Sequence, residues 1–324
     1  MKGIENYAIS LQNYLDEIVF VKDPVQLYKP INYIVSLGGK RLRPILTLMA
    51  CDFFNKDYKK ALPAALALEL FHNFSLIHDD IMDEAPLRRG KETVHHKWDL
   101  NTGILSGDAM LILAYQLFEN YEPQMFSELA KLFSKTALQV CEGQQYDVDF
   151  ETRNDVTIPD YLKMIEYKTA VLLGAAMKMG AIVAEAPEEC KENSYEFGKN
   201  LGIAFQLQDD YLDCFGNPET FGKQIGGDII ANKKTRLYLK TLENCNASDA
   251  EILKQLFTET PKDPSDKIKK VKDLYIDSGA ANESLQEIEN YTNKANTTIE
   301  HLRISEENKD NLRAFSDQLM KRKV

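Results

Sequence analysis

The sequence of 324 residues is poor in cysteine, in long apolar runs and in positive charge, and each shortage excludes a class of protein. Its five cysteines stand far apart without a C-x-x-C motif, so we expect free thiols in a reducing compartment, with no disulfide framework and no zinc site. No stretch reaches the about 18 apolar residues that span a membrane, and the N-terminus lacks the apolar core of a signal peptide. The formal net charge of −11 argues against nucleic acid as a partner. We therefore expect a cytoplasmic protein that is not an integral membrane protein.

The alternation of apolar and polar residues that marks a half-buried strand is also missing, whereas helical spacing is widespread. The composition of 44% apolar and 27% charged residues is typical of a globular protein with a sizeable core. The clearest helical segments are residues 45–54, 61–78, 104–118, 126–142 and 161–183. Because no linker is long or biased enough to separate domains, we predict a single all-α domain over residues 1–324.

Two acidic motifs, 130 residues apart, are nearly the same motif twice: residues 79–83 read D-D-I-M-D and residues 209–213 read D-D-Y-L-D. On a helix, residues four apart share a face, so the first and last carboxylates of each motif would point the same way. One such motif among 50 acidic residues would indicate a solvated helix end. Two copies, each after an apolar run, indicate buried carboxylates that need a cation. Mg²⁺ suits them, because it takes a few carboxylates together with water and substrate phosphates. Two such motifs facing one cavity would hold a diphosphate between them.

Three basic segments complete the pattern, at residues 38–44 (G-G-K-R-L-R-P), 87–90 (L-R-R-G) and 221–235, which includes F-G-K-Q-I-G-G-D and N-K-K-T. Taken with the two acidic motifs in this order, they make the chain resemble the trans-isoprenyl diphosphate synthases of the polyprenyl synthetase family, from about residue 38 to residue 235. The resemblance implies an all-α bundle of ten or more helices around a deep central cavity, usually assembled as a homodimer.

The resemblance also implies a reaction. An allylic diphosphate loses its diphosphate to give an allylic carbocation, the double bond of isopentenyl diphosphate attacks it, and a proton leaves to form a new trans double bond. Metals and fixed cations stabilise the departing diphosphate best in a water-poor site. No side chain resembles a dedicated general base, and in the family the released diphosphate is thought to take the proton.

Site residues follow from the same matching. Asp79 and Asp83 would bind Mg²⁺ on one side, and Asp209, with Asp213 nearby, would bind it on the other, so we expect more than one ion. Contacts to the allylic diphosphate are implied for Arg88, Lys168, Thr169, Gln206, Lys223 and Lys233. The isopentenyl diphosphate pocket is metal-free in the family and is matched by Lys40, Arg43, His72 and Arg89. The residues expected to be catalytic are Asp79, Asp83, Asp209, Arg88, Lys168, Lys223 and Lys233. Asn232 stands where the family commonly has glycine, and asparagine also tolerates left-handed backbone angles.

Product length is predicted from the residues before Asp79. Phe74 lies five residues earlier, about 7.5 Å along a helix axis, while Ser75 lies four and Phe71 eight residues earlier. A single aromatic at the fifth position is similar to short-chain members, so we favour a C20 product, with C15 next. Phe74 could instead be ordinary core packing.

Two other functions stay open at this stage. A terpene cyclase also uses Mg²⁺ and an Asp-rich helix, but it normally lacks a second full D-D-x-x-D motif and a pocket for a second diphosphate. The regulatory subunit of a heteromeric prenyl synthase tends to lose an acidic or a basic motif, whereas this chain keeps all of them.

Overall fold

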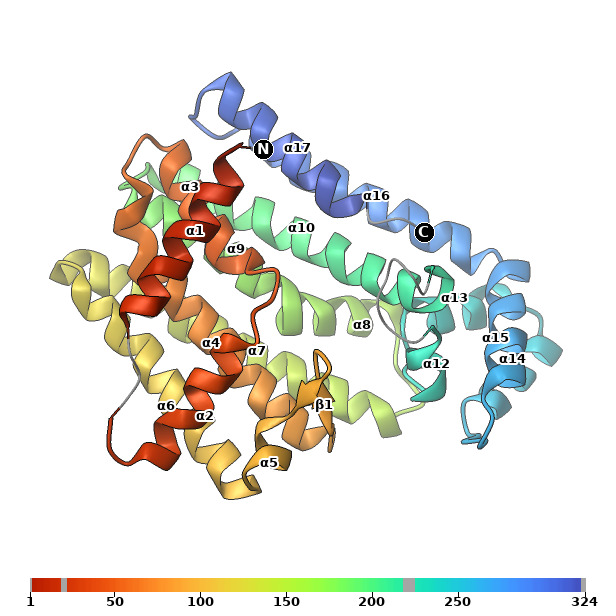
Figure 1. The fold of residues 1–324 in the computed structure, drawn as a ribbon. Coiled ribbons are helices and arrows are strands. Elements are labelled where there is room, and N and C mark those ends of the chain that lie inside the picture. Colours follow the sequence, from red (N-terminus) through yellow and green to blue (C-terminus); the bar gives the residue numbers. More distant parts are fainter. Residues whose placement is uncertain (1, 19–21, 218–224, 322–324) are drawn as a thin grey trace. The chain divides into compact units, whose positions relative to one another are not determined.

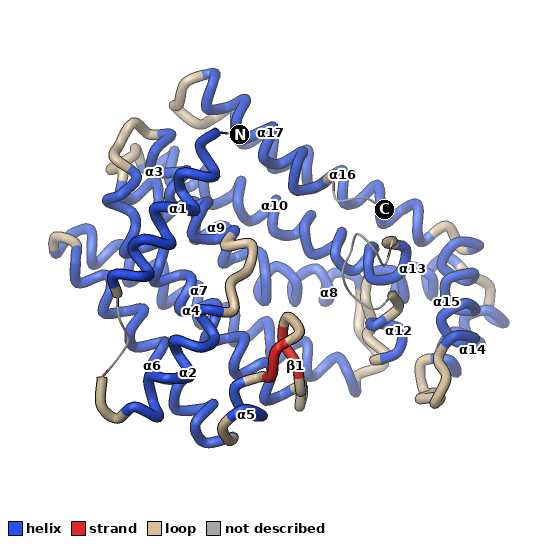
Figure 2. The backbone as a smooth tube through the Cα atoms, viewed as in Figure 1, coloured by secondary structure: helices blue, strands red, loops and turns tan. Residues whose placement is uncertain are grey.

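The computed structural model describes residues 2–18, 22–217 and 225–321, and within them the expected all-α class is confirmed. Helices account for nearly every element, and strands are confined, in these residues, to one short hairpin (Figure 2). None of the described helices is both long and apolar enough to cross a membrane.

The chain forms two compact units. Unit 1 comprises Met1–Ala137, Ala175–Tyr195 and Arg303–Ser305, and unit 2 comprises Leu138–Gly174, Glu196–Leu302 and Glu306–Val324. The division falls within three long helices, α7 (Pro123–Thr152), α9 (Val171–Val183) and α10 (Glu188–Phe215). Whether the two units act as the single domain expected from the sequence stays a prediction.

Unit 1 is built around α4 (Leu62–Met82), which packs along α6 (Leu100–Leu117) and against α3 (Leu42–Phe53) (Figure 1). The first half of α4 is apolar on almost every side, with Leu66 and Leu68 both fully buried. A helix that is apolar all round is stable only inside a protein, which explains why α4 forms the centre of this unit. Its other elements are α1 (Lys2–Glu17), α2 (Val25–Ser36), η1 (Tyr58–Ala61), α5 (Val94–Lys97), η2 (Phe118–Asn120), a short hairpin, the first part of α7, most of α9 and the start of α10.

A small hairpin follows α4, where the sequence indicated only a loop. Strands β1 (Leu87–Arg88) and β2 (Lys91–Glu92) pair antiparallel across a two-residue turn. Both turn residues, Arg89 and Gly90, have positive φ, at 53° and 73°, as the tight turns between paired strands require. Strands of two residues are too short to show alternation, so the sequence pattern missed them.

Unit 2 joins the second part of α7 to a series of helices that share one apolar core. This core includes Tyr161, Leu207 and Tyr275, all at most 2% exposed. The elements of unit 2 are α8 (Ile158–Ile165), η3 (Glu166–Ala170), α12 (Gly227–Ile230), α13 (Arg236–Asn244), α14 (Ala247–Leu256), α15 (Ser265–Asp277), α16 (Ala280–Ile299) and α17 (Glu306–Met320), with the adjoining parts of α9 and α10.

Local signals set the start of α8. Thr157 caps its first turn, with the Asp160 side chain accepting a hydrogen bond from the Thr157 backbone N–H at 3.0 Å. This reciprocal capping satisfies amides that have no partner within the helix. The next segment, η3, is a π-helical turn, and such turns often mark functional sites.

Candidate functional site: two acidic motifs and two groups of cations

The first acidic motif occupies the last turn of α4. Asp79 is half-buried and Asp83 is exposed, and the Asp83 backbone N–H donates to the Asp79 carbonyl at 2.8 Å to close the helix. Carboxylates here are unfavourable on their own, because the last carbonyls of a helix already make its end negative. The geometry therefore favours a bound cation at this turn.

Asp80, between these two residues, has a different environment. It is 1% exposed and accepts hydrogen bonds from Arg88 Nε at 2.8 and 2.9 Å, while Arg88 Nη2 lies 2.7 Å from its Oδ1. This fork fixes the β1 strand against α4. The Asp80 carboxylate is thus engaged by Arg88 and is less available to a metal ion than its neighbours. The same ion pair holds the Arg88 guanidinium beside the acidic motif.

The second acidic motif lies near the end of α10, again in the final turns of a helix. Asp209 and Asp213 are half-buried. Asp210 accepts hydrogen bonds from the Tyr161 hydroxyl at 2.6 Å and from the Gln206 amide at 2.8 Å. Burial, and then the neighbouring Asp228, raise the pKa of Asp210 to about 8. Carboxylates are crowded here, as at the end of α4.

The donor sets fit Mg²⁺. Both motifs offer only carboxylate oxygens, the hard ligands that this ion prefers, and both sit at the negative end of a helix. Within the described ranges, no three side chains of His, Cys, Asp or Glu converge on a preformed metal centre. Mg²⁺ needs none, since it commonly uses one or two carboxylates with water and substrate phosphates.

A separate group of cations in unit 1, which we call the arginine cluster, comprises Arg41, Arg43, Arg88 and Arg89 around His72. Arg43 Nη1 lies 3.3 Å from His72 Nε2. The pKa of His72 lies well below its usual value, because burial and then the adjacent arginines disfavour the imidazolium. Burial lowers the pKa of Arg43 to about 10, so its guanidinium stays charged at neutral pH.

The four arginines of this cluster outnumber the carboxylates paired with them, which are Glu69 and Asp80. Glu69, 3% exposed, accepts from Arg41 Nη1 at 2.9 Å and from the Asn73 amide at 3.0 Å. Arg43 Nε is buried and has no hydrogen-bond partner among the residues that the structure describes. An unsatisfied buried donor is unfavourable, and a diphosphate oxygen would satisfy it. The arrangement is that of an anion site.

Backbone strain accompanies the cluster. Arg41 and Arg89 both have positive φ, at 48° and 53°, an uncommon conformation for arginine that tends to occur at functional sites. Gly39 has a φ of 143°, and a Cβ there would lie only 2.7 Å from Arg89 Nη2. The backbone conformation at position 39 therefore favours glycine, which also lets the Arg89 guanidinium lie close to the loop. Lys40, exposed, follows in the same loop.

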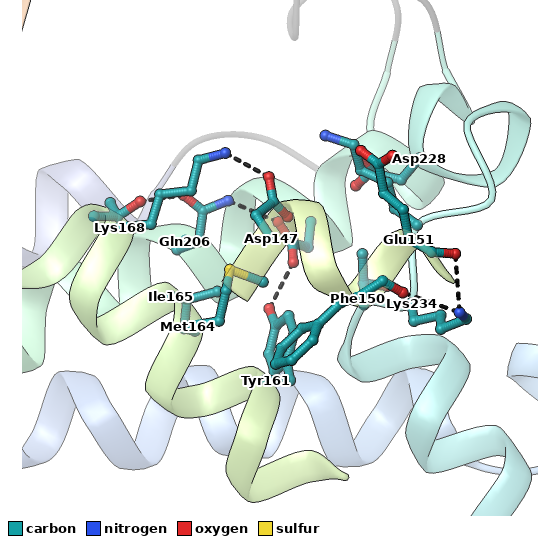
Figure 3. A pocket seen from close by; sticks show the side chains of 14 residues that line it. Asp147, Phe150, Glu151, Tyr161, Met164, Ile165, Lys168, Gln206, Asp228 and Lys234 are labelled. Atoms are coloured by element: carbon teal, nitrogen blue, oxygen red, sulfur yellow. Dashed lines mark hydrogen bonds and ion pairs between the residues drawn. The ribbon is translucent and has the colours of Figure 1, made fainter. Parts of the chain in front are cut away.

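In unit 2, a pocket of about 110 Å³ adjoins the second acidic motif (Figure 3). Its polar lining consists of Asp147, Glu151, Tyr161, Lys168, Thr169, Gln206, Asp210, Asp228, Lys233, Lys234 and Thr235. Lys168 Nζ donates to Asp147 at 2.5 Å, and the Thr169 hydroxyl donates to Gln206 at 3.0 Å. Four residues predicted to contact the allylic diphosphate therefore share one pocket: Lys168, Thr169, Gln206 and Lys233.

The π-helical turn explains how Lys168 and Thr169 reach this pocket. A Cβ on Gly143 of α7 would lie 2.2 Å from the Lys168 backbone nitrogen, so only glycine lets the turn approach α7 so closely. Lys223, predicted to act beside Lys233, lies outside the described residues.

The residues predicted to set product length lie on α4 among aromatic rings. Phe71 is 1% exposed, with ring centroids 5.5 Å from Phe74 and 5.3 Å from Phe133. Phe74 is only half-buried, and its ring also lies 4.7 Å from that of His78. The Ser75 hydroxyl donates to the His72 carbonyl of its own helix at 2.9 Å. Phe71 thus belongs to the core, while Phe74 lies at its edge.

Sequence reasoning missed several partners of these residues. Glu69 and Tyr161 sit inside helical runs and carry no motif signal. Asp147 and Asp228 became neighbours of the predicted residues only through folding. Asp228 had one available signal, because it directly follows the Gly-Gly pair in a segment that the family resemblance already covered.

The chain matches the family model described as polyprenyl synthetase over residues 24–275. It is 41% identical over 242 residues to the geranylgeranyl diphosphate synthase of Methanosarcina mazei, covering 74% of this chain and 75% of that relative. It is 39% identical over 278 residues to the geranylfarnesyl diphosphate synthase of Natronomonas pharaonis, covering 78% and 80%. A crystal structure of a geranylgeranyl pyrophosphate synthase has a TM-score of 0.95 and 54% identity, covering 99% of each chain. The chain therefore belongs to the polyprenyl synthetase family and is an all-α prenyltransferase.

Proposed function

We propose that this chain condenses isopentenyl diphosphate with an allylic diphosphate, with Mg²⁺ bound at its two aspartate motifs, to give a C20 prenyl diphosphate. The observation that carries the proposal is the presence of two kinds of anion site. In the arginine cluster Arg41 pairs with Glu69 and Arg88 with Asp80, while Arg43 Nε has no hydrogen-bond partner among the described residues, which suits a directly bound anion. The two acidic motifs instead suit a diphosphate bound through Mg²⁺. A prenyl synthase must bind two diphosphates and ionise only one.

The part of the arginine cluster formed by Arg43, His72 and Arg89 is assigned to isopentenyl diphosphate, and Arg88 is assigned to the other substrate. Arg43, His72 and Arg89 lie together there, and the unpartnered Arg43 Nε supports a phosphate contact. Lys40 would add a point charge from the loop before α3. A site without metal binds its diphosphate without assisting departure, which suits the substrate that keeps its diphosphate.

The allylic diphosphate is assigned to the acidic motifs and the unit 2 pocket. Asp79, Asp83, Asp209 and Asp213 would hold Mg²⁺, which when bound neutralises charge on the departing diphosphate. By the family resemblance, contacts to this diphosphate are also assigned to Arg88, Lys168, Thr169, Gln206, Lys233 and Lys223. An allylic cation reacts readily with water. We therefore also propose that the apolar residues lining the unit 2 pocket exclude water from the bound substrate.

A C20 product is favoured by the position of Phe74. Its ring lies at the edge of the aromatic core of α4, five residues before Asp79, where it would stop a growing tail. Relatives named geranylgeranyl diphosphate synthase support this length. Relatives named geranylfarnesyl diphosphate synthase make C25 a further length that an assay must resolve.

We also propose a homodimer. On α6, Leu105 and Ile112 are each 58% exposed, and Leu100 and Ile104 of the same helix are also exposed. Large apolar side chains gathered on one surface indicate a protein interface. A cytoplasmic location stays a prediction.

A product-length assay tests the proposed function. Purified protein would be incubated with Mg²⁺, labelled isopentenyl diphosphate and, separately, C5, C10 and C15 allylic diphosphates, and the dephosphorylated products would be sized by chromatography. We expect a C20 alcohol, and no product in EDTA until excess Mg²⁺ is restored. Folded protein that elongates no primer would contradict the proposal. Cyclic products from one allylic substrate would indicate a terpene cyclase, and activity appearing only with a second subunit would indicate a regulatory chain.

A further inference from the structure

The short loop between α12 and α13 carries Lys233 at the edge of the unit 2 pocket. Asn232, just before it, has a φ of 57°, the left-handed conformation. Backbone hydrogen bonds close the end of α12 around this residue: the Asn232 N–H donates to the Ile229 carbonyl at 3.2 Å, and the Lys233 N–H donates to the Asp228 carbonyl at 2.9 Å. Because this type of helix end requires a left-handed residue at position 232, the conformation of Asn232 sets the direction in which the chain presents Lys233.

Both neighbours of Lys233 are anchored by their side chains. On one side, Lys234 Nζ donates to the carbonyls of Phe150 and Glu151 at 2.9 and 3.2 Å, at the end of α7 (Figure 3). On the other side, the Asn232 side-chain oxygen accepts from Lys267 Nζ at 2.6 Å. Lys233 itself is exposed, between two anchored residues.

Lys267 is an unusual anchor. It lies on α15, which packs against α12, and it is 3% exposed. Its ammonium also donates to the Glu259 backbone carbonyl at 2.9 Å, so both of these acceptors are neutral. Burial lowers the pKa of Lys267, with Glu259 acting in the opposite direction. Among the described residues no carboxylate forms an ion pair with Lys267. A buried ammonium held only by neutral acceptors is unfavourable compared with an apolar side chain of similar size, so packing alone does not explain it.

The contact with Lys267 matters because residue 232 has a positive φ. Glycine adopts positive φ without strain, whereas asparagine adopts it less readily. A hydrogen bond from a fixed donor to the asparagine side chain removes its other conformations. Where glycine would adopt this φ by itself, asparagine is held in it by the hydrogen bond from Lys267.

We propose that Lys267 is a positioning residue that locks Asn232 in its left-handed conformation and thereby directs Lys233 toward the allylic diphosphate. This inference rests on the proposed function, because it assigns Lys233 to that substrate. Lys267 acts through Asn232 and the loop, and it is not itself assigned a substrate contact.

Steady-state kinetics of Lys267→Met test the proposal. Methionine keeps much of the side-chain length but removes the donor. We expect KM for the allylic diphosphate to rise about tenfold, the loss of one charged hydrogen bond, while KM for isopentenyl diphosphate changes less than about twofold. Lys269→Met, an exposed position on the same helix, is the matched control and should change neither constant. Equal rises in both KM values, or an unchanged allylic KM, would overturn the proposal.

A double-mutant cycle with Asn232→Gly separates positioning from stability. Glycine adopts the required φ without the lock, so in the Asn232→Gly background Lys267→Met should change the allylic KM less than about twofold. If its effect is the same in both backgrounds, the contact does not position the loop. Should Lys267→Met fold poorly, Lys267→Arg, which keeps a donor, should retain most of the affinity; a loss as large as in the methionine variant would count against the lock.

A binding measurement distinguishes a failure of the positioning role of Lys267 from a failure of the proposed function. Calorimetry with inorganic pyrophosphate and Mg²⁺ should give weaker binding for Lys267→Met than for the unsubstituted protein. If the unsubstituted protein elongates no primer, the proposed function fails, and this inference fails with it. If it is active and both its pyrophosphate affinity and its allylic KM are indifferent to Lys267→Met, only this inference fails.

Discussion

Replacing Phe74 by alanine is expected to lengthen the product by one isoprene unit, from C20 to C25. Phe74 is half-buried at the edge of the aromatic core, so its removal opens space along α4. The next ring on that helix is Phe71, three residues earlier and about 4.5 Å along the axis. That rise is comparable with the length of the four-carbon backbone of one isoprene unit. In Phe74→Ala the growing tail should therefore extend by one unit before it meets Phe71.

The two phenylalanines should differ in their effect on stability. Phe71 is 1% exposed and contacts Phe74 and Phe133, so Phe71→Ala should reduce the free energy of unfolding by about 3–5 kcal/mol. Phe74 is only half-buried, so Phe74→Ala should reduce it by about 1–2 kcal/mol. Ser75→Phe, which adds a second aromatic one residue closer to Asp79, should shorten the product to C15.

Chromatography of dephosphorylated products measures length, and urea denaturation measures the free energy of unfolding. The unsubstituted protein and Lys269→Met serve as controls, since Lys269 is exposed on α15 in unit 2. The reasoning would be refuted if a stable Phe71→Ala variant lengthened the product while Phe74→Ala left it at C20. The floor of the cavity would then lie elsewhere.

Three further outcomes are expected. Asp79→Ala and Asp209→Ala should each lower kcat by about a hundred- to a thousandfold with circular dichroism unchanged, because each removes a ligand for the ion that stabilises departure; near-normal turnover would contradict the metal assignment. Lys40→Ala should raise KM for isopentenyl diphosphate more than KM for the allylic substrate, and the reverse pattern in initial-rate kinetics would mean that the two diphosphate sites are exchanged. Glu69→Gln should reduce the free energy of unfolding by about 3 kcal/mol, because it breaks the buried pair with Arg41; a denaturant midpoint at the unsubstituted value would show that the cluster tolerates its full positive charge.

The fold class and the main chemical groups were predictable from the sequence. Helical spacing is local, so periodicity was enough to predict α4 and α6, although α4 continues to Met82, beyond the predicted end at residue 78. The acidic and basic motifs were equally readable, because each consists of residues a few positions apart. The β1–β2 hairpin was missed, because strands of two residues show no alternation and positive φ at Arg89 is uncommon for arginine.

The sequence by itself determined which residues carry charge, at which helical spacing and in which order. These features were enough to indicate the family and its reaction. Tertiary structure decided which of them meet. Asp80 and Asp79 are neighbours in one motif, yet only burial and the arrival of Arg88 distinguish their roles. Lys267 follows Asn232 by 35 residues, and no local pattern predicts that its ammonium reaches the asparagine side chain. Such contacts depend on how separate helices pack, and packing is a property of the whole chain rather than of any motif.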